Sequence, residues 1–335
     1  MNPVLTALLH AANKQRDDSL IVTDPAELFR LLDLDPALLA AAQTASGLFS
    51  LRVPRSYVAR MRKRDPNDPL LRQVLPIADE TIPTPGFTSD PVGDCQALVA
   101  PGVLHKYQGR VLLMTTGACG IHCRYCFRRD FPYAQSVVGT PQRRVALDYL
   151  ANQPDVSEVI LSGGDPLSLS NRRLAVLLEE LAAVPHLRRL RIHSRQPIVM
   201  PERIDSALLE LLNTSRFKVV MVVHVNHPQE IDKTVRASLA RLAAADVCLF
   251  NQAVLLRAVN DSVDTLVELS EALFSAGVIP YYLHLLDRVR GTAHFEVSED
   301  RARQLMEELR RSLPGYLVPR LVREQPGKPA KIPIL

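Results

Sequence analysis

Six short runs of apolar and β-branched residues recur between residues 111 and 285. Runs this short and this continuously apolar are typical of strands that are buried on both faces of a parallel sheet. We therefore expect six strands, at Val111–Thr115, Val156–Ser162, Leu190–Ser194, Lys218–Val223, Val247–Val254 and Ile279–Leu285.

Segments with the apolar periodicity of a helix separate these runs, and one more follows the last run. Six strand–helix units favour an α/β fold with a parallel sheet, and suit an incomplete (β/α)6 barrel better than a closed eightfold barrel. A doubly wound open sheet is the alternative, which periodicity alone does not exclude. The expected helices are Arg143–Asn152, Arg172–Ala183, Arg203–Leu212, Lys233–Ala244, Val263–Ser275 and Glu299–Ser312.

Polar residues follow the ends of these strands one after another. In both architectures an active site lies at the carboxyl ends of the parallel strands. The sequence therefore predicts an active site built from strand-end residues, namely Ser162–Asp165, His193, Arg195, His224, Gln252 and Asp287.

The first hundred residues have a different pattern, so we expect them to form a separate, mainly helical region, residues 1–100. The barrel would then span residues 101–315, and a C-terminal segment would span residues 316–335. Within the first region, Pro36–Ala45 and Ser56–Lys63 are expected to be helices. The Pro- and Asp-rich stretch Asp65–Pro91 is expected to be an extended connector.

Three of the five cysteines, Cys119, Cys123 and Cys126, lie within eight positions directly after the first expected strand. Their spacing is C-x3-C-x2-C. Cysteine thiolates bind iron–sulfur clusters, usually four to a cluster, so three would leave one iron of a [4Fe–4S] cube without a protein ligand. An open coordination position is what a catalytic metal centre needs.

A structural zinc site is the alternative for these cysteines, with His122 or His105 as the fourth ligand. Zinc ligands usually come in two separated pairs, and no second pair is present, which disfavours zinc. We expect Cys95 and Cys248 to be ordinary buried or half-buried thiols.

Composition and charge exclude little. The chain of 335 residues is 47% hydrophobic and 23% charged, and its net charge of +4 is spread without a long basic run, which does not favour nucleic acid. An anionic small molecule suits this balance.

The first 18 residues lack the features of a signal peptide, and no apolar stretch is long enough to span a membrane. We therefore expect a cytoplasmic protein, in a compartment where clustered cysteines indicate metal ligation.

The cysteine loop resembles that of the radical S-adenosylmethionine (SAM) superfamily. Ser162-Gly163-Gly164-Asp165-Pro166, after the second strand, is similar to the glycine-rich motif of that superfamily, which meets the methionine amino group of SAM. The resemblance implies that the three cysteines bind a [4Fe–4S] cluster. It also implies a SAM site made of Tyr125, Ser162, Gly163, Gly164, Asp165, His224 and Gln252, with Arg195 as a further cofactor-binding candidate; His224 could equally be a satisfied core histidine.

From about residue 50 onward the chain resembles the lysine 2,3-aminomutase family. This resemblance rests on Arg55 and on the segments Asp65–Gln73, Asp90–Asp94, Pro101–Tyr107, Val223–Pro228 and Asn251–Leu256. It implies an isomerase that moves an amino group from C2 to C3 of L-lysine, with pyridoxal 5′-phosphate (PLP) and a 5′-deoxyadenosyl radical.

In this family a lysine near the C-terminus binds PLP, and Pro326–Pro333 occupies the corresponding place. Lys331 matches the family lysine, and Lys328 is a competitor because the glycine run of the family is altered here. A solvated basic tail is the alternative that the residues alone would favour. The resemblance further implies that Lys106 and Arg110 bind the phosphate of PLP, with Tyr107 beside them.

For the substrate, the resemblance implies that Arg128 binds the carboxylate of lysine. It also implies that Asp287 and Glu324 bind the lysine ε-ammonium.

The short C-terminal segment and its Lys-Pro-Ala variation resemble the branch of the family that supplies (R)-β-lysine for a separate ligase acting on elongation factor P. This resemblance implies (S)-α-lysine as substrate and a flavodoxin- or ferredoxin-type reductant. Two alternatives remain. One is a lysine 2,3-aminomutase of catabolic or secondary metabolism, and the other is a non-catalytic, cluster-bearing scaffold for the modification of elongation factor P.

Overall fold

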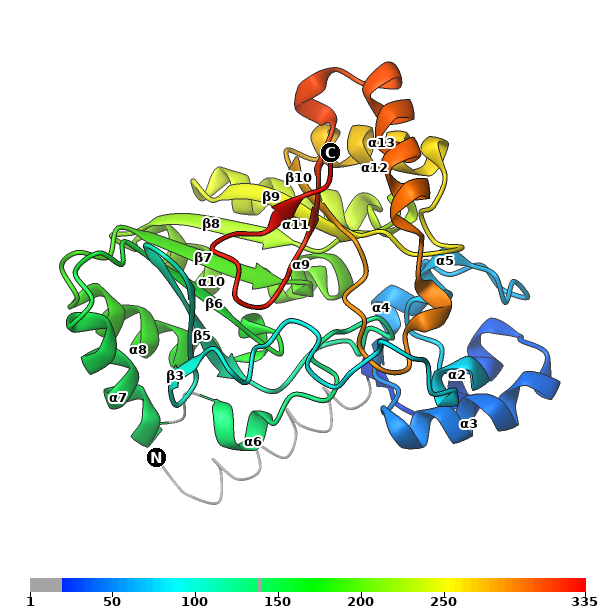
Figure 1. Cartoon of the computed structure of the whole chain (residues 1–335), viewed down its shortest axis with the longest axis horizontal. Helices are drawn as coiled ribbons and strands as arrows, with labels where there is room; N and C mark the ends of the chain where they lie inside the picture. The colour runs from blue at the N-terminus through cyan, green and yellow to red at the C-terminus, as the bar shows by residue number, and fades with distance from the viewer. Residues whose placement is uncertain (1–19, 138–139) are drawn as a thin grey trace.

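A ten-stranded sheet forms the centre of the computed structural model, which describes residues 20–137 and 140–335 (Figure 1). Its strand order is β12-β11-β10-β9-β8-β7-β6-β5-β4-β3, and every pair from β5 to β11 is parallel. Six of these strands are the expected ones: β5 (Arg110–Thr116), β6 (Glu158–Gly163), β7 (Arg189–Ser194), β8 (Lys218–Val223), β9 (Cys248–Val254) and β10 (Ile279–His284).

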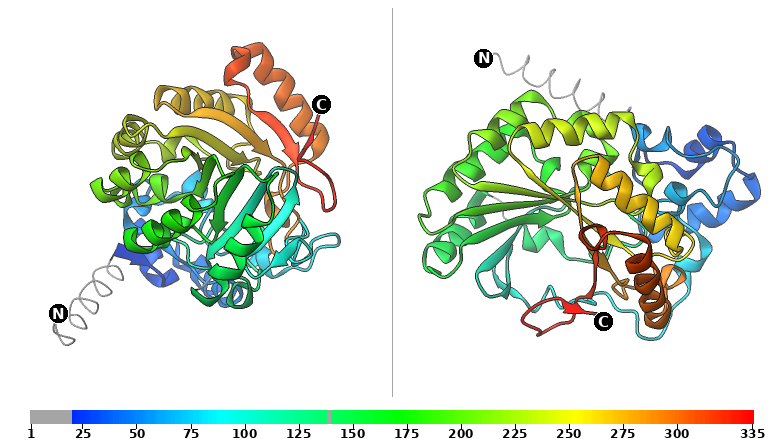
Figure 2. Two further views of the ribbon diagram at one scale, coloured as in Figure 1. Left: turned by 90° about the vertical axis from the view of Figure 1, so that its left-hand side faces the viewer. Right: turned by 90° about the horizontal axis from the view of Figure 1, so that it is seen from above.

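This order runs along the sequence without reversal. A doubly wound sheet would reverse direction at a switch point, so that alternative is wrong. The mostly parallel α/β architecture is confirmed, and the sequential order is the one expected of an incomplete barrel. Figure 2 shows the helices as an arc around the sheet, with the C-terminal strand on the side that the arc leaves open.

Helices follow the parallel strands as expected, and each of the last five is preceded by an N-cap serine or aspartate whose side chain accepts a hydrogen bond from the first turn. Because the cap residue sets the start, α10 begins at Ser206, after a 3₁₀ turn, and not at Arg203 as expected. The helices are α7 (Thr140–Ala151), α8 (Asn171–Ala182), α10 (Ser206–Asn213), α11 (Lys233–Ala244), α12 (Val263–Ser275) and α13 (Glu299–Ser312).

Four further strands extend the sheet at its two edges, and the sequence analysis did not predict them. The strands β3 (Leu98–Ala100) and β4 (Val103–Tyr107) form an antiparallel hairpin next to β5. At the other edge, β11 (Arg320–Arg323) pairs parallel with β10, and β12 (Ile332–Pro333) pairs antiparallel with β11. The alternative of a solvated basic tail is therefore wrong, since the segment is part of the sheet.

The N-terminal region contains the short strand pair β1 (Ile21–Val22) and β2 (Val53–Pro54) and the helices α2 (Pro25–Leu32), α3 (Leu39–Leu48) and α4 (Arg55–Val58). The helix expected at Pro36–Ala45 is split into a 3₁₀ turn, Pro36–Leu38, and α3. The helix expected at Ser56–Lys63 is wrong beyond Val58, because the chain turns there and Arg64 takes a left-handed conformation with φ 61°. The first 18 residues, on which the signal-peptide expectation rests, lie outside the described residues.

The stretch Asp65–Pro91 is not an extended connector. It forms α5 (Pro69–Arg72) and a 3₁₀ turn, η2 (Ala78–Thr81), and it buries Leu70, Leu71 and Val74 in the main hydrophobic core. The prediction failed because the frequent prolines and aspartates here start and cap short helices: Asp68 accepts hydrogen bonds from the amides of Leu70 and Leu71.

Short helical turns after several strands complete the fold. They are α6 (Tyr133–Ser136), η3 (Pro166–Ser168), α9 (Gln196–Val199), η4 (Pro201–Arg203), η5 (Pro228–Glu230), η6 (Ala293–Phe295) and η7 (Gly315–Leu317). Within residues 20–137 and 140–335, no helix is both long enough and apolar enough to cross a membrane.

Candidate active site

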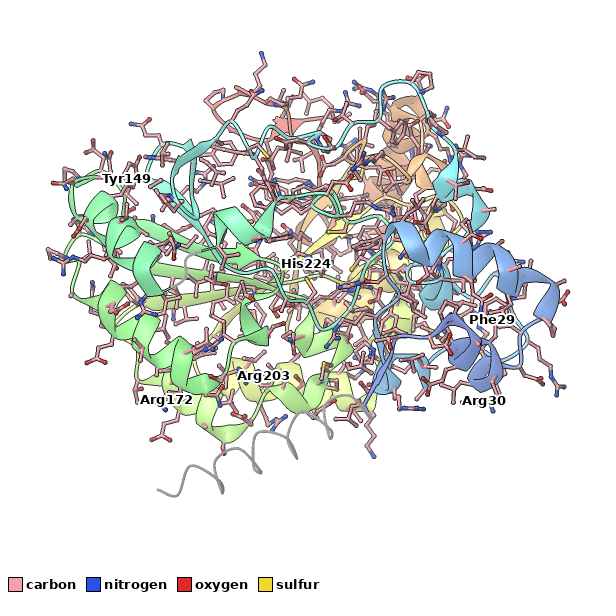
Figure 3. The ribbon with its side chains drawn as sticks, turned by 90° about the horizontal axis from the view of Figure 1, so that it is seen from below. Phe29, Arg30, Tyr149, Arg172, Arg203 and His224 are labelled. Carbon is pink, nitrogen blue, oxygen red and sulfur yellow. The ribbon has the colours of Figure 1, made fainter. Side chains whose placement is uncertain are left out.

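A cavity of about 430 Å³ lies at the carboxyl ends of the parallel strands, and every site residue predicted from the sequence lines it. This volume is within the range of roughly 300–1,000 Å³ that is usual for small-molecule sites. Figure 3 shows His224 in the interior of the molecule, whereas Arg30 and Arg172 lie at its periphery. The structure therefore brings the predicted residues together, although their individual roles stay predictions.

The cysteine loop follows β5 and is held from the N-terminal side of the chain. The guanidinium of Arg124, fully buried, forms a two-point ion pair with Glu80 (2.8 and 2.5 Å) and donates to the carbonyl of Phe49 at 2.6 Å. Arg52 donates to the carbonyl of Cys119 at 2.8 Å. These contacts fix the backbone that presents the three half-buried thiols of Cys119, Cys123 and Cys126 to the cavity.

The glycine pair after β6 packs directly against the cysteine loop. A Cβ on Gly163 would lie 2.5 Å from the carbonyl oxygen of Thr116, and one on Gly164 would lie 2.4 Å from that of Ala118. The amides of Gly164 and Asp165 donate to these same two carbonyls at 2.7 and 2.8 Å. The absence of side chains thus permits a backbone contact between the two motifs, in addition to any approach of a ligand.

The carboxylate of Asp165 is buried and already accepts several hydrogen bonds. Its oxygens accept from the hydroxyl of Ser194 at 2.7 Å and from the amides of Arg195 and Leu167 at 2.8 and 3.0 Å. Asp165 therefore ties the glycine motif to the end of β7. Its predicted contact with SAM stays a prediction.

The zinc alternative finds no support among the described residues. No three His, Cys, Asp or Glu side chains there converge closely enough to ligate a single metal ion. The Nδ1 atom of His122 lies 2.9 Å from the carbonyl oxygen of Ser50, and that of His105 lies 2.7 Å from the hydroxyl of Tyr149. In contrast, a cubane cluster takes its thiolates on separate irons and does not need them to meet at one point.

The two remaining cysteines lie apart from this loop. Cys248 is half-buried as expected. Cys95 is exposed, which corrects the expectation of a buried thiol.

A chain of alternating charges crosses the cavity wall. Asp94 contacts the ammonium of Lys106 at 2.5 Å and Nε of Arg128 at 2.6 Å. Glu324 contacts Lys106 at 3.0 Å and Lys331 at 2.5 Å. Although burial opposes it, Lys331 and Lys106 hold the pKa of Glu324 well below its ordinary value, so this carboxylate is ionised.

Asp287 also lines this cavity, and it forms no ion pair with a described residue. Burial, with the nearby charge of Glu324, raises the pKa of Asp287 to about 7. Glu324 and Asp287 both line the cavity, and among the described residues the lysines that contact Glu324 are Lys331 and Lys106, the second of which also contacts Asp94. This arrangement is suited to binding a further cation.

Three histidines line the cavity, of which His284 is buried and His193 and His224 are half-buried. Burial lowers the pKa of His224 to about 3 and lowers those of His193 and His284 well below their ordinary value. Nε2 of His224 lies 3.0 Å from Nε2 of Gln252. In contrast, Nε2 of His193 and Nε2 of His284 are buried without a partner. The cavity wall therefore has hydrogen-bonding capacity that the protein itself does not use.

The remaining predicted side chains have distinct environments. The hydroxyl of Tyr125 accepts a hydrogen bond from the Asn226 amide at 2.7 Å. The guanidinium of Arg110 lies over the ring of Tyr107, 4.5 Å from its centroid, and forms no ion pair with another described residue. Lys328 is exposed and does not line the cavity, whereas Lys331 does.

Sequence reasoning missed Asp94 and His284 as site residues. Asp94 is the acidic link between Lys106 and Arg128, and two predicted cations close together were a signal that a counter-charge was needed. His284 ends β10 and stands three positions before Asp287, so the strand-end rule applied to β10 could have found it.

Several known proteins of one name are similar to this chain in sequence. No family model matches the chain. L-lysine 2,3-aminomutase of Escherichia coli (strain K12) is 52% identical over 315 residues, which is 94% of this chain and 92% of that protein. The protein of the same name from Haemophilus influenzae is 44% identical, over 92% of each chain, and that from Clostridium subterminale is 38% identical, over 83% of this chain and 67% of its own.

Solved structures give a weaker likeness. A radical SAM methyltransferase from Sphaerobacter thermophilus has a TM-score of 0.47 at 15% identity and covers 66% of this chain and 68% of its own. The structure of anSMEcpe with bound AdoMet and a Cp18Cys peptide has a TM-score of 0.47 at 11% identity, over 60% and 58%.

Proposed function

The chain belongs to the L-lysine 2,3-aminomutase family and is therefore an isomerase, and from this premise we propose that it converts (S)-α-lysine to (R)-β-lysine. The proposed reaction is a radical 1,2-amino shift that depends on a [4Fe–4S] cluster, SAM and PLP. The observation that carries the proposal is that the cysteine loop lines the same cavity as Lys331, Asp287 and Glu324, which lie far from it in the sequence.

The cavity fits an iron–sulfur cluster at its cysteine side. Cys119, Cys123 and Cys126 would hold the cluster, which would supply the electron that cleaves SAM to a 5′-deoxyadenosyl radical. The protein's part is to hold these groups away from water, and the loop is anchored for this by Arg52 and Arg124. Tyr125, Gln252 and the backbone of the glycine pair are the candidates for positioning SAM beside the cluster.

Other residues of the same cavity fit PLP. Lys331 would hold it covalently, and PLP would supply the carbonyl carbon that carries the migrating amino group. Arg110, without an ionic partner among the described residues, is the first candidate for its phosphate. Lys106 is the second, and it would have to share its charge between the phosphate and the two carboxylates that it now contacts.

The carboxylates favour lysine as the substrate. Glu324 already binds one ammonium, that of Lys331, which stands in for the charge of a substrate ammonium. Once Lys331 is used to hold PLP, Glu324 and Asp287 would be left to bind the ε-ammonium of lysine. A substrate with an anionic side chain would be repelled by the same two groups. Arg128, fixed by Asp94, is the candidate for the substrate carboxylate.

The test is an anaerobic assay of the reconstituted protein with SAM, PLP, dithionite and L-lysine. We expect β-lysine from the wild type and none from Cys126→Ala or Lys331→Ala. A protein that binds the cluster and SAM but makes no β-lysine would support the scaffold alternative and refute the proposed activity.

We further propose that the β-lysine serves the modification of elongation factor P, in the cytoplasm, with a flavodoxin- or ferredoxin-type protein as reductant. The support is that identity is highest with relatives whose length the chain nearly matches: 52% and 44% where it covers 92% of the relative, against 33% where it covers 60%. A catabolic or secondary-metabolic role is the second candidate.

The mass of elongation factor P separates these roles. In cells that lack this protein, we expect elongation factor P without the β-lysyl group, restored by the wild type and by added β-lysine but not by Cys126→Ala. An unchanged mass in the deletion strain would refute the role in this modification and leave the isomerase activity intact.

A further inference from the structure

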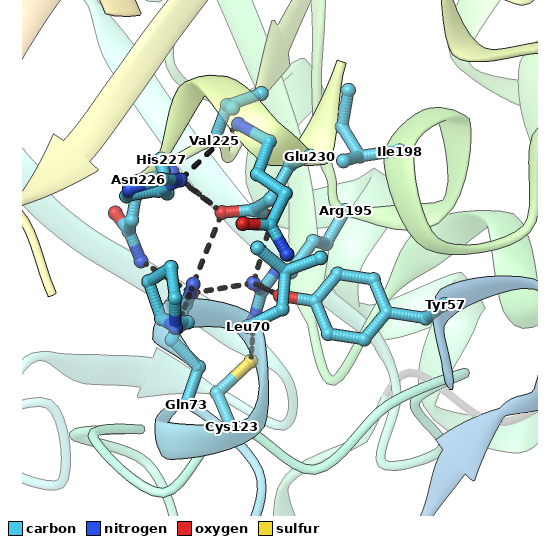
Figure 4. Close-up of polar contacts among 12 residues, drawn as sticks. Tyr57, Leu70, Gln73, Cys123, Arg195, Ile198, Val225, Asn226, His227 and Glu230 are labelled. Carbon is cyan, nitrogen blue, oxygen red and sulfur yellow. Dashed lines mark hydrogen bonds and ion pairs between the residues drawn. The ribbon is translucent and has the colours of Figure 1, made fainter. Parts of the chain in front are cut away.

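The guanidinium of Arg195 contacts one of the three cysteines directly. Arg195 follows β7, and its side chain is only 5% exposed. Its Nη1 donates to Sγ of Cys123 at 2.8 Å, and Figure 4 shows this contact at the edge of a larger polar cluster. In the described part of the chain, no side chain makes such a hydrogen bond to Cys119 or Cys126. The three thiols are therefore not equivalent.

The position of this guanidinium does not depend on the cysteine. Nη2 of Arg195 contacts the hydroxyl of Tyr57 at 3.1 Å, Oε1 of Gln73 at 2.7 Å and Oε2 of Glu230 at 3.0 Å. Tyr57, Gln73 and Glu230 are all fully buried. Nη1 is thus aimed at Cys123 by contacts on the far side of the guanidinium.

Glu230 is itself held rigidly. Its Oε1 accepts from the side-chain amide of Gln73 at 3.2 Å and from the backbone amides of Asn226 and His227 at 2.9 and 3.2 Å. The second carboxylate oxygen faces Arg195. The cation of Arg195 therefore lies next to Cys123, and the anion of Glu230 lies on the far side of Arg195. Both side chains are buried.

Charges and hydrogen bonds near a cluster change its reduction potential. Reduction adds negative charge to the cluster and its thiolates, so a cation or a donor at the thiolate stabilises the reduced form and raises the potential. A buried anion has the opposite effect. The low local dielectric strengthens both effects.

We propose that Arg195 raises the reduction potential of the cluster through its hydrogen bond to Cys123, and that Glu230 limits this increase by its opposing charge. The inference rests on the proposed function, since it assumes that Cys123 ligates a cluster. Arg195 and Glu230 are then positioning residues that set the ease of the first electron transfer, and the N-terminal region takes part through Tyr57 and Gln73.

The test is a redox titration of the reconstituted protein, followed by electron paramagnetic resonance of the reduced cluster. For Arg195→Gln, which removes the cation, we expect the equilibrium constant for reduction to fall about tenfold, a shift of about 59 mV to lower potential. Arg195→Lys keeps the positive charge, but its one amino group cannot reach both Glu230 and Cys123. We therefore expect its reduction potential to fall, by less than that of Arg195→Gln. For Glu230→Gln, which removes the anion, we expect a shift to higher potential.

Arg195→Gln and Glu230→Gln are expected to shift the reduction potential in opposite directions. A general loss of structure would not give shifts of opposite sign, so the pair of variants separates it from an effect of charge. Arg216→Gln is the matched control, because Arg216 is a structural arginine at the other end of the strands that donates to the carbonyls of Ala182, Val184 and Leu187. We expect the reduction potential of the cluster in Arg216→Gln to equal that in the wild type.

Three outcomes would overturn the inference. They are an Arg195→Gln cluster at the wild-type potential, a shift of Glu230→Gln in the same direction as Arg195→Gln, and loss of the cluster from all three variants while Arg216→Gln retains it. A wild type that binds no iron and sulfide would instead refute the proposed function itself.

Discussion

At the scale of single residues, Lys328 and Lys331 lie three positions apart but differ in exposure and in contacts. Lys331 lines the cavity and contacts Glu324, whereas Lys328 is exposed at the turn before it. We therefore expect Lys331→Ala to abolish the covalent attachment of PLP after borohydride reduction, and Lys328→Ala to retain it. Peptide mass spectrometry of the reduced protein measures this directly. PLP found on Lys328 in the wild type would reverse the assignment.

Asp287 should make lysine binding depend on pH. Its pKa is raised by burial and by Glu324 to about 7, above its ordinary value of 3.8. The stability that Asp287 contributes is therefore greatest below pH 3.8 and is lost as the pH rises through about 7. Binding of an ammonium needs the ionised form and changes in the opposite direction, so KM for lysine should rise as the pH falls below 7, by at most about tenfold per pH unit.

The matched control is Asp287→Asn, which keeps the shape of the side chain and cannot ionise. Its KM for lysine should be raised at every pH and should lack the change near pH 7. A wild-type KM that stays constant from pH 8 to pH 6 would contradict this role of Asp287.

The candidate site was predictable at this scale where chemistry depends on residue type and spacing. The sequence alone shows the spacing of the cysteines, and it predicts the positions of Ser162, His224 and Asp287 at strand ends. The two predicted cations only indicated that some counter-charge was needed. That Asp94 provides it was not visible, because this depends on contacts with Lys106 in β4 and with Arg128 in the loop after Cys126. The partnership of Arg195 with Gln73 was hidden for the same reason.

At the scale of elements, the contact between the glycine motif and the cysteine loop gives a sharp test. In Gly164→Ala, the new methyl group would lie 2.4 Å from a backbone oxygen of the loop, so the loop must move. We expect a loss of roughly 1–3 kcal/mol in the free energy of unfolding and a lower iron content after reconstitution. Gly315→Ala is the control, because nothing lies within 4 Å of its Cβ position, and it should match the wild type in both measurements.

The ion pair between Arg124 and Glu80 joins the cysteine loop to η2. Both side chains are fully buried, so Glu80→Ala would leave the guanidinium of Arg124 buried and short of its anionic partner. We expect a loss of about 3–5 kcal/mol in the free energy of unfolding, measured by denaturant titration. A loss below about 1 kcal/mol would contradict a structural role for the pair.

The elements that the sequence predicted well are those with strong periodicity. All six central strands and the six helices that follow them are present, with bounds that differ by a few residues from those expected, as at the start of α10. The edge strands β3, β4, β11 and β12 were missed because they are short and only partly apolar, so that their pairing depends on neighbours far away in the sequence. Asp65–Pro91 was misinterpreted because prolines and aspartates mark helix starts as often as loops.

At the scale of the whole molecule, the cavity is lined by two parts of the chain that lie far apart in the sequence. The cysteine loop and glycine motif follow β5 and β6, whereas Glu324 and Lys331 belong to the C-terminal edge of the sheet. In the described part of the chain, no hydrogen bond joins residues 325–335 to the cysteine loop. We therefore expect deletion of residues 325–335 to abolish PLP binding and β-lysine formation while reductive cleavage of SAM continues.

Chromatography of 5′-deoxyadenosine and methionine measures SAM cleavage without lysine turnover. A matched variant, Lys331→Ala in the full chain, should behave in the same way. Loss of the cluster on deletion would instead mean that the two parts fold as one unit.

The separation of these two parts along the chain also sets an order of assembly. Cys126 leaves the ribosome about 200 residues before Lys331, an interval of roughly 10–40 s at usual rates of protein synthesis. During this interval the nascent protein has the cysteine loop but lacks β11 and β12, and with them the cavity residues Glu324 and Lys331. A carrier that delivers iron and sulfide in this interval would therefore meet the cysteine loop before Glu324 and Lys331 complete the lining of the cavity.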